Sequence, residues 1–297
     1  MEQFIKSFFS NLWQTFLSVV KIVLKSSLRT PLPSVPSGAG YGGSDAGGEL
    51  LILANGPSLT QTVHSHPGFL RGKELLAVNH AATSDLFVEL KPQYYLLADP
   101  LFWIVPEIKE KTFGALVERT AWPMVLFMPT RAWKDRSWQE MVARNAQIRV
   151  VKYNSTPVEG FPWFCNLVYK AGLGMPRPHN VLIPSIAVGI RMGFRRIYLA
   201  GADHSWLPEI TVNDRNEVLM NQKHYYDQGT SKARAVRNEN LTTARLSTIL
   251  HHMSVAFGSY FVLRDFARFC GAEVINVTPG SFIDAFPRLQ LPPEPQG

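Results

Sequence analysis

The sequence predicts an α/β fold built on a doubly wound, mostly parallel sheet of the Rossmann-like type, preceded by an amphipathic helix. Three observations lead to this prediction. From residue 49 onward, short apolar runs alternate with helix-length segments, as they do in parallel sheets that helices cover on both faces. Small and polar residues stand directly after several of these runs. Residues 1–29 carry apolar side chains at a helical period.

Composition favours one substantial core with an appendage. The chain has 297 residues, of which 46% are hydrophobic and 18% charged, and this suits one catalytic domain better than two. Its formal net charge of +7 favours anionic partners without choosing among membranes, nucleic acids and phosphorylated ligands. Cys165 and Cys270 lie far apart and outside any C-x-x-C spacing, so neither a disulfide framework nor a zinc site is indicated.

The first element expected is an amphipathic helix over residues 1–29. One stripe holds Ile5, Phe9, Leu12, Phe16, Val20 and Val23, whereas Gln3, Lys6, Ser10, Gln14, Ser18, Lys21 and Lys25 fall on the opposite side. Polar residues interrupt the apolar run before it reaches the roughly 18 residues that a spanning helix needs. The pattern favours a helix on the surface of an anionic membrane. The alternative is a helix packed on its own domain or on a second subunit.

Residues 30–48 are expected to be a flexible linker, because they contain Pro, Gly and Ser with almost no large apolar side chain. The helix is therefore expected to be tethered to the domain and not integrated with it. Gly38, Gly40 and Gly43 match the G-x-G-x-x-G pattern, but they precede the first strand, whereas a dinucleotide fingerprint follows one. The catalytic domain is assigned to residues 49–290 and a tail to residues 291–297.

The elements of the domain follow in order from the alternation of apolar runs. Strands are predicted at 49–54, 74–78, 93–98, 123–128, 148–152, 196–200 and 273–277. Helices are predicted near 100–118, 132–144, 183–193 and 240–270. In such a sheet, ligands bind at the carboxyl ends of the strands.

The residues that follow the strands are the candidates for binding a ligand. Asn55, Gly56, Pro57 and Ser58 follow the first strand in a turn suited to phosphate or ribose, although Asn and Ser also cap helices for structural reasons. The remaining candidates are Asn79 after the second strand, Asp99 after the third, Gly201, Asp203, His204 and Ser205 after the sixth, and Ser185 in the small-residue helix before it. An acid at a strand end can orient a ribose, a sugar hydroxyl or a metal.

These segments resemble a known group of enzymes. The Asn55–Leu59 turn, Asn79, and the stretch from Ile186 through Asp203 look like the bacterial sialyltransferases of the Campylobacter lipooligosaccharide type. They are equally similar to the glycosyltransferase domains of motility-accessory proteins and to hydroxymethylpterin diphosphokinase-like proteins. The turn that contains Thr278 and Ser281 is similar to the last strand and polar turn of the group. The likeness spans about residues 49–287.

The resemblance implies a donor activated with CMP and an inverting transfer that needs no metal and no cofactor. It implies nucleotide contacts from Asn55, Gly56, Ser58, Asn79 and Asp203. In the group, a mobile lid after the corresponding sixth strand holds the cytidine phosphate, and a lid histidine acts as base. Residues 206–240 are the expected lid, because they form a long connection without a clear period.

The catalytic candidates lie in the middle of this lid. His224 is the predicted base and Asp227 the next candidate, since neutral histidine accepts a proton well near pH 7. The base histidine of the group aligns more nearly with Gln228, so this position departs from the pattern. Ser205 stands where the group places a phosphate-binding tyrosine, and Tyr225 or Tyr226 is expected to substitute as a donor to the leaving phosphate.

The predicted function is transfer of sialic acid, a related nonulosonic acid or Kdo to a lipid-linked or polysaccharide acceptor of the cell envelope. We expect a cytoplasmic enzyme held peripherally on the inner face of the membrane by residues 1–29, with self-association left open. The alternative is a pterin diphosphokinase-like enzyme using ATP and Mg²⁺, for which no G-x-x-x-x-G-K-[ST] motif occurs. Nucleic acid is not an expected partner, because the domain shows no basic stripe with interleaved aromatics.

Overall fold

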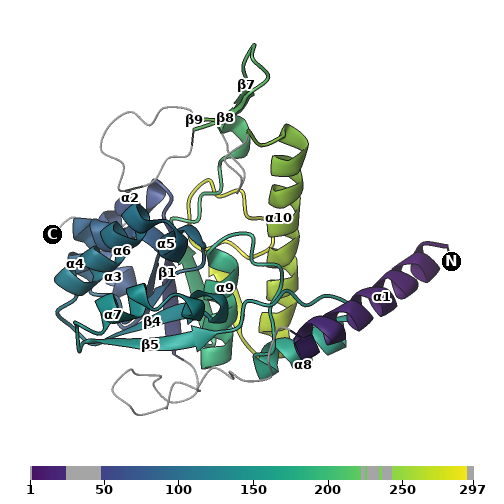
Figure 1. Ribbon diagram of the computed structural model, residues 1–297, viewed down its shortest axis with the longest axis horizontal. Coiled ribbons are helices and arrows are strands. Elements are labelled where there is room, and N and C mark those ends of the chain that lie inside the picture. Colours follow the sequence, from purple (N-terminus) through teal and green to yellow (C-terminus); the bar gives the residue numbers. More distant parts are fainter. Residues whose placement is uncertain (1, 25–47, 222–224, 226–233, 236–242, 293–297) are drawn as a thin grey trace.

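A computed structural model describes residues 2–24, 48–221, 225, 234–235 and 243–292. Its centre is a seven-stranded sheet in which every neighbouring pair is parallel. The strand order is β10-β6-β1-β2-β3-β4-β5 (Figure 1). The strands are β1 (Glu49–Leu53), β2 (Glu74–Val78), β3 (Tyr94–Leu96), β4 (Met124–Pro129), β5 (Ile148–Tyr153), β6 (Arg196–Ala200) and β10 (Glu273–Asn276). The predicted doubly wound α/β fold is confirmed.

Helices cover both faces of this sheet. On one face lie α8 (Pro162–Ala171), α9 (Leu182–Met192) and α10 (Leu246–Phe269), and their side chains share one core cluster with Leu50, Ile52 and Leu76. The opposite face carries α2 (Ser58–Ser65), α3 (Pro67–Leu70), α4 (Asp85–Leu90), α5 (Leu101–Ile104), α6 (Pro106–Arg119) and α7 (Ser137–Val142). Consecutive strand residues point to opposite faces, so Leu51 and Leu53 belong to this second layer.

The helices depart from the predicted ones in two segments, 100–118 and 132–144, and further short turns form elsewhere. The predicted helix 100–118 is broken into α5 and α6, because Pro106 disfavours a helical backbone at Val105, whose ψ is 115°. The predicted helix 132–144 is a 3₁₀ turn (Thr130–Lys134) followed by α7. Further 3₁₀ turns span Asn79–Thr83 and Leu207–Glu209.

Part of the segment expected to lack regular structure forms a hairpin. The strands β7 (Ile210–Val212) and β8 (Val218–Met220) pair antiparallel, and β9 (Arg234–Ala235) adds a third strand. Asn213 stabilises the turn, since its Oδ1 accepts hydrogen bonds from the N–H groups of Arg215 and Glu217.

The N-terminal helix α1 (Glu2–Leu24) forms as predicted, but its docking differs from the expectation of a helix held only by its linker. The Ser18 hydroxyl donates to the Glu159 carbonyl at 2.8 Å and accepts from the Glu159 N–H at 2.9 Å. The Phe161 N–H donates to Thr15 Oγ1 at 3.0 Å, and Ile22 joins the main core cluster. The helix therefore packs on the domain through its polar side, and the prediction of a merely tethered helix is wrong.

Candidate functional site

The candidate site lies where the chain reverses its direction of winding. From β1 the chain adds β2 through β5 on one side, and it then crosses back to place β6 on the other side of β1. Ligands of doubly wound sheets bind at this switch point, beyond the carboxyl ends of the two strands. The Gly56 N–H donates to the Gly201 carbonyl at 2.8 Å, so the loops that follow β1 and β6 are in contact.

The contact between these loops depends on the absence of a side chain at residue 56. A Cβ atom placed on Gly56 would lie 1.8 Å from Asp203 Oδ2 and 2.4 Å from the Gly201 carbonyl oxygen. The same carboxylate oxygen accepts a hydrogen bond of 2.9 Å from Ser58 Oγ. Burial raises the pKa of the Asp203 carboxyl, and the Ser58 hydroxyl acts in the opposite direction. Gly56, Ser58 and Asp203 are thus brought together as predicted.

Two asparagine side chains at neighbouring strand ends carry buried oxygens that lack a hydrogen-bond partner among the described residues. They are Asn55 Oδ1 after β1 and Asn79 Oδ1 after β2. Asn79 has a positive φ of 52°, a conformation that asparagine tolerates better than most residues. Tyr95 holds the local backbone, because its hydroxyl donates to the Asn79 carbonyl and accepts from the Ala82 N–H. Other buried polar atoms of the described chain, such as Thr120 Oγ1, also lack a partner, and what distinguishes the two asparagine oxygens is their place at adjacent strand ends, where ribose hydroxyls or a base amine can donate.

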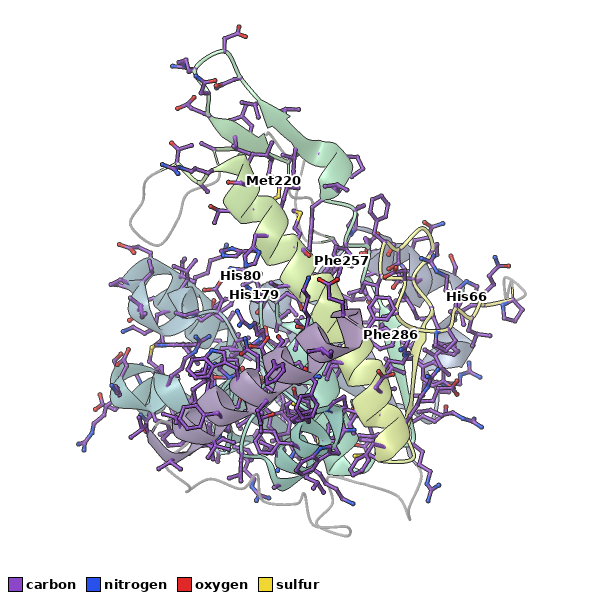
Figure 2. The ribbon with its side chains drawn as sticks, turned by 90° about the vertical axis from the view of Figure 1, so that its right-hand side faces the viewer. His66, His80, His179, Met220, Phe257 and Phe286 are labelled. Atoms are coloured by element: carbon purple, nitrogen blue, oxygen red, sulfur yellow. The ribbon has the colours of Figure 1, made fainter. Side chains whose placement is uncertain are left out.

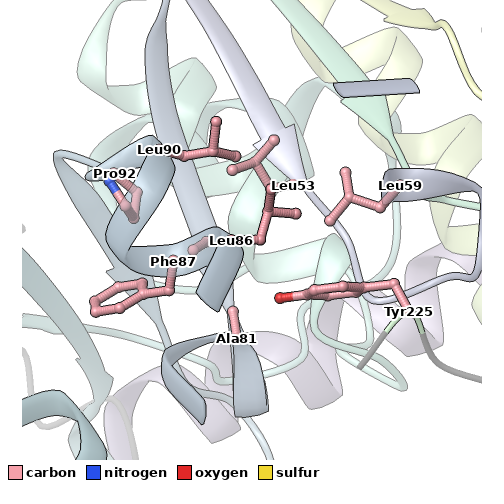
Figure 3. Close-up of a pocket in the computed structure, with 9 residues that line it drawn as sticks. Leu53, Leu59, Ala81, Leu86, Phe87, Leu90, Pro92 and Tyr225 are labelled. Carbon is pink, nitrogen blue, oxygen red and sulfur yellow. The ribbon is translucent and has the colours of Figure 1, made fainter. Parts of the chain in front are cut away.

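Tyr225 lies across the ends of β1 and β2. Its N–H donates to the Asn55 carbonyl at 3.1 Å, and its hydroxyl lies 3.0 Å from Ser84 Oγ. The ring fills an apolar niche that includes Leu53, Leu59 and Leu86 and leaves a cavity of only about 10 Å³ (Figure 3). Burial raises the pKa of its hydroxyl. Tyr225 is therefore a point at which the chain after β8 contacts the candidate site. The other predicted catalytic residues, His224, Tyr226 and Asp227, lie outside the described residues.

The loop after β6 is supported by polar residues that follow β10. Thr278 Oγ1 accepts from the Ala202 N–H at 3.0 Å and donates to the Leu199 carbonyl. Ser281 Oγ donates to the Ala202 carbonyl at 2.6 Å and accepts from Asn276 Nδ2 at 2.8 Å. Thr278 and Ser281 are both buried, so in this structure they position the loop that contains Asp203.

Four other predicted residues occupy different environments. Ser185 is fully buried within α9, where its hydroxyl donates to the Val181 carbonyl. Asp99 Oδ1 accepts from the Leu101 N–H at the start of α5. Pro57 is exposed at the start of α2, and Ser205 is half-buried in the loop after β6.

The side chain of His204 lies against α10. It has a positive φ of 52°, and its Nε2 hydrogen-bonds the buried hydroxyl of Tyr260 on α10. Burial lowers the pKa of His204 to about 3, so the imidazole is neutral at physiological pH. Its geometry is that of a structural hydrogen-bonding residue between β6 and α10.

Sequence reasoning did not identify Tyr95 and Ser84 as parts of the site. Tyr95 lies within an apolar strand, where a tyrosine is indistinguishable from other core aromatics. Ser84 precedes α4, where a serine is usual for capping reasons. Only the contacts with Asn79 and Tyr225 give these two residues a place in the site.

No metal site was predicted, and in the described part of the chain no group of three or more His, Cys, Asp or Glu side chains is placed to hold a metal ion. Cys165 and Cys270 are free cysteines, and burial raises the pKa of both thiols.

Comparisons with known proteins find likenesses among solved structures. The MAf glycosyltransferase from Magnetospirillum magneticum AMB-1 has a TM-score of 0.48 and 11% identity, with 83% of this chain and 34% of that protein covered. MoeE5 in complex with UDP-glucuronic acid and NAD has a TM-score of 0.22 and 14% identity, covering 54% of this chain and 66% of the other. MoeE5 with UDP-glucose and NAD gives a TM-score of 0.22, 13% identity, and 79% and 77% coverage.

The chain thus spans about a third of the length of the Magnetospirillum protein. No family model and no curated protein matches the sequence. At these identities and TM-scores the likenesses carry no argument about function, which has to be argued from the site. The resemblance to the sialyltransferase group stays a prediction.

Proposed function

We propose that this protein is a glycosyltransferase that moves sialic acid, a related nonulosonic acid or Kdo from a CMP-activated donor to an envelope glycan or glycolipid. The observation that carries the proposal is the pair of buried oxygens, Asn55 Oδ1 and Asn79 Oδ1, at adjacent strand ends beside the switch point. A ribonucleoside supplies the donors that these oxygens require, in its ribose hydroxyls and in the amino group of cytosine.

The surroundings of these oxygens also suit a nucleotide. The Asp203 carboxylate adds an acceptor in the loop that faces Asn55, and the start of α2 directs the positive end of a helix toward the same edge of the sheet. The expected lid, residues 206–240, contains Lys223, Lys232 and Arg237 in its sequence, and we propose that their charge balances that of a nucleotide phosphate. The choice of CMP over other nucleotides follows from the resemblance described above.

In the proposed reaction, an acceptor hydroxyl oxygen attacks the anomeric carbon of the donor sugar from the face opposite the phosphate. The new carbon–oxygen bond forms as the bond between the anomeric carbon and the phosphate oxygen breaks, and CMP leaves with the bonding electron pair. His224, or Asp227 in its place, takes the proton of the acceptor hydroxyl. Tyr226 donates to the departing phosphate. The reaction inverts the anomeric configuration and is proposed to need no metal.

Calorimetry with CMP, CDP and ATP, each with EDTA and with Mg²⁺, tests the binding step. Binding selective for CMP in EDTA supports the proposal, whereas Mg²⁺-dependent binding of ATP supports the diphosphokinase alternative. A donor screen with CMP-Neu5Ac, CMP-Kdo and CMP-pseudaminic acid, measuring CMP release, then tests transfer. The H224A variant should lower kcat by roughly 10²–10⁴ while CMP affinity is retained. Full activity of H224A together with full activity of D227N would exclude both residues as the base.

A further inference from the structure

The exposed surface of α1 is the most apolar feature that the proposed reaction does not use. Phe9, Trp13 and Phe16 are each more than half exposed, and so are Val23 and Leu24. Ile5, Phe8, Leu12, Val19 and Val20 are exposed as well. Single exposed apolar residues are normal, but a continuous row along one helix marks a surface that binds an apolar partner.

The way in which α1 docks explains why this row faces outward. Ser18 is fully buried and Thr15 is half-buried, and both hydrogen-bond the backbone of residues 159–161. Gly160 accommodates the approach, because a Cβ at this position would lie 2.1 Å from Thr15 Oγ1. At 100° per residue, Phe9 and Phe16 project roughly opposite to Ser18. The side that carries Thr15, Ser18 and Ile22 is therefore used for docking, with Phe8 against Phe161 at its edge, and the side that carries Phe9 and Phe16 points away from the domain.

The docking also bears on whether α1 spans a bilayer. By length and mean hydropathy, α1 and α10 are each apolar enough to cross a membrane, but α10 packs on the sheet through Tyr260, Leu263 and Phe266. In α1, Thr15 and Ser18 hydrogen-bond the backbone of residues 159–161, and Ile22 is buried in the core cluster. One side of the C-terminal half of the helix is therefore covered by the domain, which favours a helix that lies along a membrane surface over one that lipid surrounds.

The width of the apolar surface of α1 indicates that its partner is a bilayer and not a second copy of α1. From Phe8 through Phe16 to Leu24, the exposed apolar side chains spread over roughly 160° of the helix circumference. A two-helix seam needs only the narrower a/d stripe, with charged residues on its flanks. Here the flanks carry Phe8 and Trp13. Lys21 projects between the apolar surface and the docked side, where its ammonium group can reach lipid headgroups, and Lys6, which pairs with the exposed Glu2 at 2.6 Å, lies at the edge of the apolar surface.

We propose that α1 lies in the plane of an anionic bilayer as a fixed platform, with Phe9, Trp13 and Phe16 in the headgroup and acyl boundary and Ser18 bonded to the domain. Figure 1 shows the inner end of α1 near α8 and the rest of the helix projecting outward from the domain, and Figure 2 shows the ribbon of the same helix in front of the sheet. The helix thereby holds the domain at a set distance and orientation. The inference concerns membrane binding alone and is independent of the proposed transfer reaction.

Flotation of the full chain with vesicles tests the proposal, using phosphatidylcholine vesicles with and without 30 mol% (about a third) phosphatidylglycerol. Wild-type protein should float with the anionic vesicles. The F9S/F16S variant should partition about a hundredfold less, because each phenylalanine withdrawn from the interface weakens binding by roughly tenfold. The matched control I104S/V212S removes two exposed apolar side chains from α5 and β7 and should float like wild type. Circular dichroism checks that both variants fold.

Two outcomes would overturn the proposal. One is F9S/F16S floating as well as the control. The other is a wild-type chain that does not float with anionic vesicles and forms a stable dimer by light scattering, while F9S/F16S is a monomer. That result would assign the apolar surface to a second copy of the chain. Neither outcome involves a sugar donor, so failure here is distinct from failure of the proposed transferase.

Discussion

Replacing Asn55 with alanine should separate ligand binding from folding. Asn55 Oδ1 is buried without a hydrogen-bond partner among the described residues, and an unsatisfied buried polar atom costs a folded protein about 1–3 kcal/mol. N55A removes that oxygen together with a little side-chain packing. We therefore expect the free energy of unfolding to stay unchanged or to rise by about 1 kcal/mol. The affinity for CMP should fall at least tenfold, or about 1.4 kcal/mol, because a donor of the nucleotide loses its acceptor.

Asn145 provides a matched control, since its amide group is fully used. Its Nδ2 donates to the carbonyls of Val117 and Thr120, each at 2.8 Å. N145A leaves those two carbonyls without this donor and should cost about 1–3 kcal/mol of stability while leaving CMP affinity unchanged. Urea denaturation gives the stability of both variants, and calorimetry gives the affinity. The reasoning is refuted if N55A loses as much stability as N145A and keeps its CMP affinity.

Three further predictions follow from the same contacts. G56A should lose about 2–4 kcal/mol of stability and most CMP affinity, because its Cβ would overlap Asp203 and the Gly201 carbonyl. The control is G114A in α6, whose Cβ would have no atom within 4 Å and which should melt at or slightly above the wild-type temperature. Y225A should speed deuterium exchange in residues 206–221 and weaken CMP binding, whereas Y225F keeps the ring in its niche and should change both by less. His204 has its pKa lowered from 6.5 to about 3, so its contribution to stability is complete above pH 6.5 and is lost as the pH falls toward 3. In urea titrations between pH 7 and 4, H204N should flatten the acid-side decline by up to about 1.4 kcal/mol per pH unit, and an unchanged slope would contradict the burial of this imidazole.

The sheet could be predicted closely from the sequence. Strands buried on both faces are near-continuous apolar runs, and the predicted ranges 74–78 and 196–200 agree with β2 and β6 at both ends. Short helices such as α4 and α8 were missed, because a segment of one to three turns gives too few periods to distinguish it from a loop.

The site was predictable only where it is local in sequence. The turn at Asn55 and the acid at Asp203 follow from strand ends, but the Ser58–Asp203 hydrogen bond joins residues 145 positions apart. The docked side of α1 was beyond prediction for the same reason. Amphipathicity shows which side of a helix is apolar, whereas the partners of Thr15 and Ser18 lie in the 159–161 loop, and only the folded chain brings them together.

The central claim is that a cytidine nucleotide binds at the carboxyl ends of β1, β2 and β6. A crystal structure of the protein with CMP tests it most directly. We predict a donor of the nucleotide within 2.7–3.2 Å (about the usual hydrogen-bond range) of Asn55 Oδ1, with Asn79 and Asp203 also lining the bound nucleotide. Well-ordered CMP at any other place on the molecule, with Asn55 Oδ1 still lacking a donor, would contradict the account.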